Sequence, residues 1–407
     1  MENDSPRVDS GLMACRASAV VVVATLLLGC GSRSGLFSDE PAETRGELPP
    51  SALPVPEDRA VDLSAGLFHS CAVGASGAAR CWGFNTAGQL GDGGAASRAA
   101  AGLVVALPPA VRVAAGREHT CALDDGGSAW CWGTNANGEL GGDMEALRSL
   151  EPVSVRGLSP ANALSAGGHH TCALHRGGSI TCWGRNDHGQ LAGRAGDDRI
   201  LESPPIALAA RVSAGWLHTC AVLRTGEVAC WGHDGDGRLG VRGGTSLVAR
   251  VPGVLDAADV SAGDHHSCAV DLYGAAWCWG RNDWAQAGQP ASDAEPPGRV
   301  PGLADAVEIS AGHEHTCALR ATGAVVCWGR ADRGQLGDGG GYALSEVPIT
   351  TLTEEHGVEQ ISVGWRHGCA RLGTGAIFCW GRTTEGQVGG GTRGLGVEPS
   401  PVLGWDG

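Results

Sequence analysis

The sequence predicts an all-β protein built from seven similar units, and three repeated patterns support this prediction. Two cysteines ten positions apart recur seven times, and their first members are spaced by 48 to 52 residues. In each copy a histidine stands two residues before the first cysteine, and Trp-Gly follows the second. Units of about 50 residues with four short strands are typical of a β-propeller. We therefore expect a seven-bladed β-propeller with four-stranded antiparallel blades.

The cysteine pair predicts a β-hairpin in each unit. In the second copy nine residues separate Cys121 from Cys131, so if the two face each other the turn holds an odd number of residues, most simply 125–127. A three-residue hairpin turn ends in a residue with positive φ, which glycine adopts without steric cost. Glycine occupies this position in all seven copies, as Gly77, Gly127, Gly178, Gly226, Gly274, Gly323 and Gly375.

The hairpin register assigns the repeated residues to two faces. Side chains two apart on a strand share a face, so the histidine and both cysteines should lie on one side and the tryptophan on the other. Opposite the tryptophan stands Ser or Thr in six copies and Gly368 in the seventh. Such small residues leave room for the indole to pack against a neighbouring sheet. The tryptophans are Trp82, Trp132, Trp183, Trp231, Trp279, Trp328 and Trp380, and the histidines are His69, His119, His170, His218, His266, His315 and His367.

The third copy indicates how four strands fit into one unit, at residues 163–167, 170–174, 180–184 and 204–210. The loop after the third strand carries Gly-Gln-Leu-Gly or a close variant in most copies, and glycines at this density indicate tight loops. Strands alternate in direction. The first-to-second and third-to-fourth loops should therefore emerge on one face of the ring, and the hairpin tips on the other.

The order of motifs, SAGxxHTCAL followed by GxxxCWGxNxxGQLG, resembles the regulator of chromosome condensation repeat, which forms seven-bladed propellers. The resemblance covers residues 62–405. It implies that the repeated His and Gly positions are structural and not catalytic. The chain begins on a first strand at 62–66 and ends on a fourth at 400–404, so, as in the resembled family, we expect the last strand to pair with the first and close the ring.

The N-terminal region has the features of an exported lipoprotein. Residues 17–28 form an apolar run too short to span a bilayer and of the right length for a signal-peptide core. The run ends in Leu-Leu-Gly-Cys, which resembles the bacterial lipobox, where the cysteine (here Cys30) is diacylated and becomes the mature N-terminus. An ordinary secretory signal with a chance cysteine is the alternative. The residues before the run are acidic, so Met13 is a second candidate start.

These features divide the chain into three parts. We expect a lipoprotein signal peptide at 1–29, a disordered lipid-anchored linker at 30–60 that is rich in Pro, Glu and Ser, and the propeller at 61–407. The expected location is the cell envelope, at the outer membrane or cell surface.

The cysteine count agrees with this division. Of 16 cysteines, Cys15 leaves with the signal peptide and Cys30 takes the lipid, so 14 remain for seven hairpin pairs. Facing cysteines in an exported protein favour disulfides. A metal site is the alternative, because His-x-Cys with a facing Cys offers three ligands, but zinc-binding cysteines normally come as CxxC. The expected bridges join Cys71 to Cys81, Cys121 to Cys131, Cys172 to Cys182, Cys220 to Cys230, Cys268 to Cys278, Cys317 to Cys327 and Cys369 to Cys379.

Composition and motifs argue against several functions. A net charge of −15, with 29 arginines and no lysine, argues against a nucleic-acid surface. No Gly-x-Ser-x-Gly elbow, phosphate loop or HExxH is present. Asp234 and Asp236 could suggest a calcium loop, but they occupy a repeat turn. We therefore expect no enzyme activity, no cofactor, no metal site and no exchange-factor role of the kind that the resemblance suggests.

The two residues between the repeated Gly and His differ in every copy, while their neighbours barely change. Positions that vary within an otherwise constant repeat, and that carry large apolar and cationic side chains, are typical of a binding face. We expect a monomeric scaffold that binds an envelope or extracellular protein; the resembled fold includes a secreted bacterial inhibitor of β-lactamase. Glycan or peptidoglycan binding is the alternative, and an envelope enzyme a remote one. The expected binding residues are Leu67, Phe68, Arg117, Trp216, Leu217, His265, His313, Trp365 and Arg366.

Overall fold

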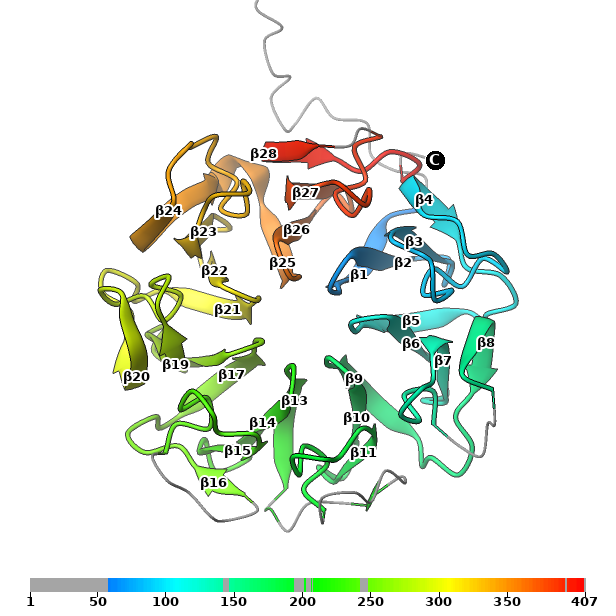
Figure 1. Cartoon of the computed structure of the whole chain (residues 1–407), viewed down its shortest axis with the longest axis horizontal. Coiled ribbons are helices and arrows are strands. Elements are labelled where there is room, and N and C mark those ends of the chain that lie inside the picture. The colour runs from blue at the N-terminus through cyan, green and yellow to red at the C-terminus, as the bar shows by residue number, and fades with distance from the viewer. Residues whose placement is uncertain are drawn as a thin grey trace, which may run out of the picture. The chain divides into compact units, whose positions relative to one another are not determined.

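The computed structural model describes residues 58–141, 146–193, 201–202, 206, 208–241, 248–391 and 394–405. They form seven four-stranded antiparallel sheets arranged as the blades of a ring (Figure 1). In every blade the spatial order of the strands is their sequence order, and the first strand lies nearest the axis (Figure 1). The predicted seven-bladed propeller is thus confirmed. The predicted signal peptide, Cys30 and residues 31–57 lie outside the described residues.

Blade 1 contains β1 (Ala60–Ala65), β2 (His69–Gly74), β3 (Ala79–Gly83) and β4 (Arg98–Leu103). Blade 2 contains β5 (Ala110–Ala115), β6 (His119–Asp124), β7 (Ala129–Thr134) and β8 (Arg148–Ser154). Blade 3 contains β9 (Ala161–Ala166), β10 (His170–His175), β11 (Ile180–Gly184) and β12 (Leu201–Glu202). Blade 4 contains β13 (Ala209–Ala214), β14 (His218–Leu223), β15 (Val228–Gly232) and β16 (Ala249–Arg250).

Blade 5 contains β17 (Ala257–Ala262), β18 (His266–Asp271), β19 (Ala276–Asn282) and β20 (Ser292–Arg299). Blade 6 contains β21 (Ala306–Ala311), β22 (His315–Arg320), β23 (Val325–Arg330) and β24 (Leu344–Leu352). Blade 7 follows a short 3₁₀ turn, η2 (Glu354–His356), and contains β25 (Val358–Val363), β26 (His367–Leu372), β27 (Ile377–Arg382) and β28 (Leu395–Pro401).

The central hairpin of each blade has the predicted register. Cys121 pairs with Cys131 across β6 and β7, and the turn glycine Gly127 has a φ of +85°. The equivalent glycines of the other blades also have positive φ, from +83° to +92°. All seven cysteine pairs form disulfides between residues ten apart. The hairpin, the turn and the seven bridges are therefore confirmed.

The hydrophobic core is divided into seven layers between neighbouring blades. In one layer Trp132 of blade 2 packs against the disulfide of Cys71 and Cys81 in blade 1, together with Leu90 and Val113. The seven equivalent tryptophans are at most 1% exposed. Cysteines and tryptophans therefore lie on opposite faces of each blade, so that the indole of one blade covers the disulfide of the blade before it.

The innermost strands leave backbone N–H groups unpaired on one edge, and side chains of the preceding blade accept many of them. Ser64 Oγ accepts a hydrogen bond from the Ala115 amide at 2.9 Å, and Ser165 Oγ accepts one from Ala214 at 2.9 Å. Six blades provide such a serine. Because unpaired strand edges are otherwise prone to pair with other chains, these serines complete the wall of the central channel.

Two expectations about fourth strands are wrong. The fourth strand of blade 3 is β12, at Leu201–Glu202, and not at residues 204–210, whose last two residues begin β13 of the next blade. The last strand, β28, pairs with β27 and not with β1. Each blade is completed by four consecutive strands of its own, so no strand remains to be exchanged between the two ends.

The ring is closed instead by side chains and by the C-terminal segment. Trp405 is 2% exposed and packs with Ala60 of β1 in the layer between blades 7 and 1. Its Nε1 donates to the Gly375 carbonyl at 3.2 Å, and the Ala60 amide donates to the same oxygen at 3.1 Å. Leu403 accepts a hydrogen bond from the amide of Ala101 in β4. The first strand of the ring and the segment after its last strand therefore meet on the turn that ends in Gly375.

Replacing the closing indole should loosen the ring. Trp405→Ala is expected to lower the free energy of unfolding by about 3 to 5 kcal/mol, the usual cost of removing a buried tryptophan. Leu403→Ala, whose side chain is 43% exposed, is the matched control and should change it by less than about 1 kcal/mol. Denaturant melts of the two variants measure the difference, and equal costs would show that Trp405 does not close the ring.

Candidate functional site

Seven three-residue loops between the first and second strands, each a glycine followed by two variable residues, surround one end of the central channel. We call their variable residues the doublets, and this side of the ring the doublet face. A cavity of about 80 Å³ lies at its centre, and Leu67, Arg117, Trp216 and Trp365 contribute to its lining. All of these doublet residues are half-buried. Four of the nine predicted binding residues are therefore brought together around one opening.

Steric crowding by the next blade explains why glycine precedes each doublet. A Cβ on Gly66 would lie 2.3 Å from the carbonyl oxygen of Gly116, the equivalent residue of the next blade. The Leu67 amide donates to this same oxygen at 3.1 Å, and the Arg117 amide donates to Gly167 O at 3.2 Å. Equivalent backbone hydrogen bonds link the loops of blades 1 to 6 in succession. They form a stiff collar that holds the variable side chains.

The repeated histidines link neighbouring blades from inside. His69 is fully buried, and its Nε2 lies 2.8 Å from Thr120 Oγ1 of the next blade. The Thr120 hydroxyl donates to the Gln89 carbonyl at 2.8 Å, so His69 Nε2–H must donate to the hydroxyl oxygen. Trp132 Nε1 donates to the Gln89 carbonyl as well, at 2.9 Å. We call this four-residue arrangement the interblade joint.

Six of the seven joints contain the histidine–hydroxyl contact. The seventh histidine, His315, faces Gly368, and neither ring nitrogen has a hydrogen-bond partner. Burial lowers the pKa of the histidines, to about 3 for His315 and His367. These side chains are therefore neutral at physiological pH.

One cluster on the doublet face is built around Trp365. Its ring centroid lies 5.0 Å from that of Phe68, in an edge-to-face arrangement, and 5.3 Å from that of His313. The guanidinium groups of Arg366 and Arg382 lie 4.3 and 5.6 Å from the indole centroid. These residues come from blades 6, 7 and 1. The cluster therefore combines aromatic and cationic groups across two blade boundaries.

A second cluster is built around Trp216. The Arg117 guanidinium lies 5.0 Å from its ring centroid, and His169 packs edge-on at 5.8 Å. His169 bridges Arg117, at 3.0 Å, and the carboxylate of Glu139, at 3.3 Å. Burial alone would raise the pKa of Glu139, but the hydrogen bonds from His169 and Asn137 outweigh it and lower the pKa to about 2. Glu139 is therefore an anion that fixes the position of Arg117 through His169.

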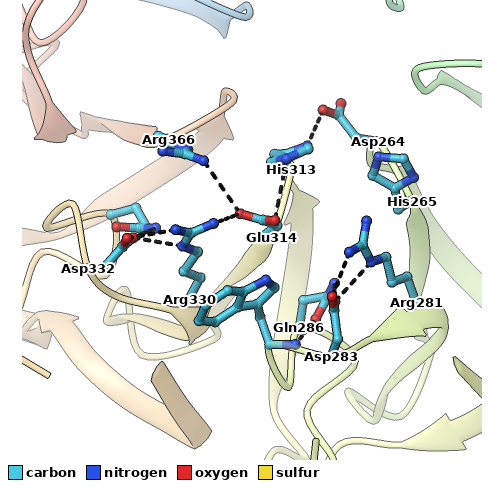
Figure 2. Close-up of polar contacts among 12 residues, drawn as sticks. Asp264, His265, Arg281, Asp283, Gln286, His313, Glu314, Arg330, Asp332 and Arg366 are labelled. Atoms are coloured by element: carbon cyan, nitrogen blue, oxygen red, sulfur yellow. Dashed lines mark hydrogen bonds and ion pairs between the residues drawn. The ribbon is translucent and has the colours of Figure 1, made fainter. Parts of the chain in front are cut away.

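Between the clusters, blades 5 to 7 carry a network of charged groups, which Figure 2 shows. Glu314 accepts a hydrogen bond from Arg330 at 2.6 Å and lies 3.8 Å from Arg366. His313 lies 2.6 Å from Asp264 through Nδ1 and 3.5 Å from Glu314 through Nε2. Arg330 also pairs with Asp332, and Arg281 pairs with Asp283. Beyond the contacts drawn in Figure 2, Arg238 of blade 4 contacts Asp236 of its own blade and His265 of blade 5.

The structure adds residues that the sequence analysis left out. The guanidinium of Arg330 stacks 4.2 Å from the ring of Trp284, and Arg382 joins the Trp365 cluster. Arg330 and Arg382 end the third strands of their blades, one residue after Trp-Gly, and could have been found by comparing that position between copies. Of the predicted residues, Leu217 is half-buried, and no ring or charge contact of its side chain is described.

The opposite half of the channel holds buried carboxyl groups in a cavity of about 370 Å³, lined by Asp62 and Glu308 among others. Asp62 accepts a hydrogen bond from the Val113 amide and Glu308 one from the Ile361 amide. Burial, together with repulsion from Asp259, raises the pKa of Glu308 to about 8. These groups therefore cap inner strands of the next blade.

Two searches of the described part of the chain are negative. No group of three or more His, Cys, Asp and Glu side chains is placed to hold a metal ion among these residues. No helix in the same part of the chain is long and apolar enough to cross a membrane.

The buried histidines predict a loss of stability in acid. Burial lowers the pKa of His69, His170 and His266 to about 3, from the ordinary value of 6.5. The unfolded chain therefore binds more protons than the folded one between these values, and the free energy of unfolding falls as the pH decreases through this window. Each histidine contributes up to about 1.4 kcal/mol per pH unit.

Denaturant melts at pH 7, 6 and 5 measure this slope. Glu308, Asp62, Asp234 and Asp259 act in the opposite direction, because burial raises their pKa values, but they are four groups against seven histidines. His170→Gln should reduce the proton uptake on unfolding by about one. Equal stability at pH 7 and pH 5 would contradict neutral histidines in the joints.

With the fold and the site described, comparisons with known proteins place the chain among its relatives. The profile of the RCC1-like domain matches residues 101–404, and that of the regulator of chromosome condensation repeat matches residues 60–89 and 76–123. The comparison with curated protein sequences found no match.

Several solved structures share the fold. Prp20p from Saccharomyces cerevisiae, described with its binding to Gsp1p and histones, superposes with a TM-score of 0.71 at 21% identity, covering 85% of this chain and 87% of that one. Human WBSCR16 superposes with a TM-score of 0.72 at 22% identity, covering 80% of this chain and 94% of the other. The ectodomain of the Physcomitrella patens receptor kinase CR4 gives 0.51 at 20% identity, with coverages of 79% and 72%. The repeats, the propeller and the profile match over most of its length show that this chain belongs to the RCC1-like domain family.

Proposed function

We propose that the protein is a non-catalytic scaffold of the cell envelope and that its doublet face binds another protein. The observation that carries this proposal is the chemistry of the face. Two tryptophans, each with an arginine stacked on it, stand around one opening on a backbone collar. Tryptophan and arginine are the residues most enriched among the energetic anchors of protein interfaces.

The relatives support protein binding in general terms. Prp20p is described with its binding to Gsp1p and histones, and the yeast protein has also been crystallised with Kap60 bound. At about 20% identity the likeness extends to the fold and not to those partners. The net charge of −15 argues against a nucleic-acid partner, because both molecules would be anionic. A shared fold does not imply a shared partner, so the proposal rests on the clusters of the doublet face.

Protein binding is favoured over glycan binding because arginine side chains cover the ring faces of both indoles. A sugar stacks on an open aromatic face, but the guanidinium of Arg117 lies over Trp216 and that of Arg366 over Trp365. Phe68 and His313 further cover the edges of Trp365. Arginine–tryptophan pairs of this kind present charge and apolar surface together, as protein partners require.

Binding and folding should depend on different tryptophans. With the partner captured from envelope extracts by the mature chain from Gly31 onward, Trp216→Ala and Trp365→Ala should each weaken binding by about 2 kcal/mol or more. Both side chains are half-buried, so stability should change by about 1 kcal/mol. Trp183→Ala is the control: it is 1% exposed and should cost about 3 to 5 kcal/mol of stability while the folded fraction still binds.

Capture of polysaccharide alone would favour glycan binding over protein binding. If Trp216→Ala and Trp183→Ala destabilise the protein equally, Trp216 belongs to the core, and the doublet face loses its main support as a recognition surface.

The same proposal places the protein on a membrane through a lipid on Cys30. The apolar run and the Leu-Leu-Gly-Cys motif support it, as do the disulfides, which form and persist in exported proteins. Metabolic labelling with palmitate should mark the wild-type protein, and Cys30→Ser should abolish the label. Label that persists in Cys30→Ser would show that the lipid is elsewhere.

A further inference from the structure

The side of the ring opposite the doublet face carries several exposed apolar side chains on three neighbouring blades. This side, the hairpin-tip face, is formed by the turns between the second and third strands and by the segments that lead into each first strand. Leu272 and Tyr273, at the tip of blade 5, are 71% and 78% exposed. Leu208, Leu255 and Val307 are 51%, 64% and 53% exposed. Single exposed apolar residues are common, but five on one side of a monomer need an explanation.

Backbone hydrogen bonds join the segments that carry these five residues, which we call the band. The amide of Arg224, at the tip of blade 4, donates to the carbonyl of Leu208, at 2.9 Å. The amide of Leu272 donates to the carbonyl of Asp256, the neighbour of Leu255, at 2.8 Å. The amide of Ala306 donates to Gly274, next to Tyr273. The Ala257 amide donates to the carbonyl of Gly226, at the tip of blade 4, at 2.9 Å, so these segments follow one another from blade 4 to blade 6.

Arginines extend the band on its blade 3 side. Arg176 and Arg224 are exposed at neighbouring hairpin tips, and Arg224 donates to the Arg176 carbonyl at 3.3 Å. Two exposed acids lie nearby: Asp256 in the band and Glu227, which is paired with Arg250 at 3.1 Å. The chain has a net charge of −15, so an apolar band with unpaired arginines at one end differs from the acidic character of the chain as a whole.

The N-terminal segment joins the ring on this same face. The carboxylate of Asp58 accepts a hydrogen bond from the Ser76 amide at 2.9 Å, and Arg59 Nε donates to the Thr374 carbonyl at 3.1 Å. Ser76 and Thr374 are hairpin-tip residues of blades 1 and 7. A lipid anchor at Cys30 would therefore be connected to the ring on its hairpin-tip face.

We propose that the band of Leu208, Leu255, Leu272, Tyr273 and Val307 rests in the interfacial region of an anionic phospholipid bilayer, with Arg176 and Arg224 at the lipid headgroups. Exposed leucine and tyrosine beside arginine are the side chains that peripheral proteins insert at this depth. The orientation rests on the proposed anchor at Cys30, but the contact itself does not need the lipid. With the hairpin tips on the membrane, the doublet face points away from it and is free for a protein partner.

The test uses the mature chain from Gly31 onward, secreted without the lipidated cysteine so that only the propeller can hold the membrane. Flotation with vesicles of phosphatidylcholine containing phosphatidylglycerol should carry the wild-type protein to the lipid fraction. Leu272→Ser/Tyr273→Ser should reduce the bound fraction by about tenfold or more, since the two most exposed apolar side chains are lost. Arg176→Gln/Arg224→Gln should weaken binding to these vesicles and leave binding to pure phosphatidylcholine unchanged.

Leu147→Ser/Tyr342→Ser is the matched control. It replaces one leucine and one tyrosine, 73% and 37% exposed, in loops between third and fourth strands on the doublet side of the ring, and should bind vesicles as the wild type does. Failure of the wild-type chain to float, or an equal loss in control and test variants, would overturn the proposal. Sedimentation as a dimer that Leu272→Ser/Tyr273→Ser abolishes would assign the band to self-association instead. Neither result bears on partner capture by the doublet face, which is measured without lipid.

Discussion

The ring depends on the interblade joint, in which one blade provides a histidine and a backbone carbonyl and the next provides a hydroxyl and an indole. At the first joint, Thr120 accepts from His69 and donates to Gln89, whose carbonyl also accepts from Trp132. All four groups are buried, so each needs the others: a hydrogen bond lost inside the protein leaves an unpaired polar group that costs about 1 to 3 kcal/mol. The joint therefore couples the sheets more specifically than apolar packing alone.

The joint also explains why a protein with seven repeated histidines shows no catalytic arrangement among them. Burial keeps each ring neutral, and the donating Nε2 is occupied in six blades. At the seventh joint a Cβ on residue 368 would come within 2.6 Å of Trp380, so the indole fills the space that a hydroxyl-bearing side chain takes elsewhere. The boundary between blades 6 and 7 thus lacks one internal link, and the ion pairs of Glu314 with Arg330 and Arg366 lie beside it on the doublet face.

The doublets and the hairpin tips are two sets of loops that vary between blades, and they carry different kinds of side chain. The doublets combine tryptophan, arginine and histidine in mutual contact, which suits a specific protein surface. The hairpin tips of blades 3 to 5 combine separate exposed apolar side chains with arginines, which suits a fluid lipid surface. Because the N-terminal segment enters at the hairpin tips, the two proposed contacts are compatible. The hairpin-tip face would contact the membrane, and the doublet face would remain accessible to a protein partner.

The sequence by itself determined the features that depend on local geometry. Cysteine spacing and the turn glycine set the register of every hairpin, and with it the disulfides and the two faces, since these follow from residues at most ten apart. Tertiary structure alone decided the long-range contacts. Trp405, and not a shared strand, closes the ring. Phe68 contacts Trp365, and Arg330 stacks on Trp284. These contacts join blades whose relative positions cannot be derived from the spacing of residues in the sequence. The same holds for the hairpin-tip band, because its residues are ordinary apolar side chains until the ring places them side by side on one exposed face.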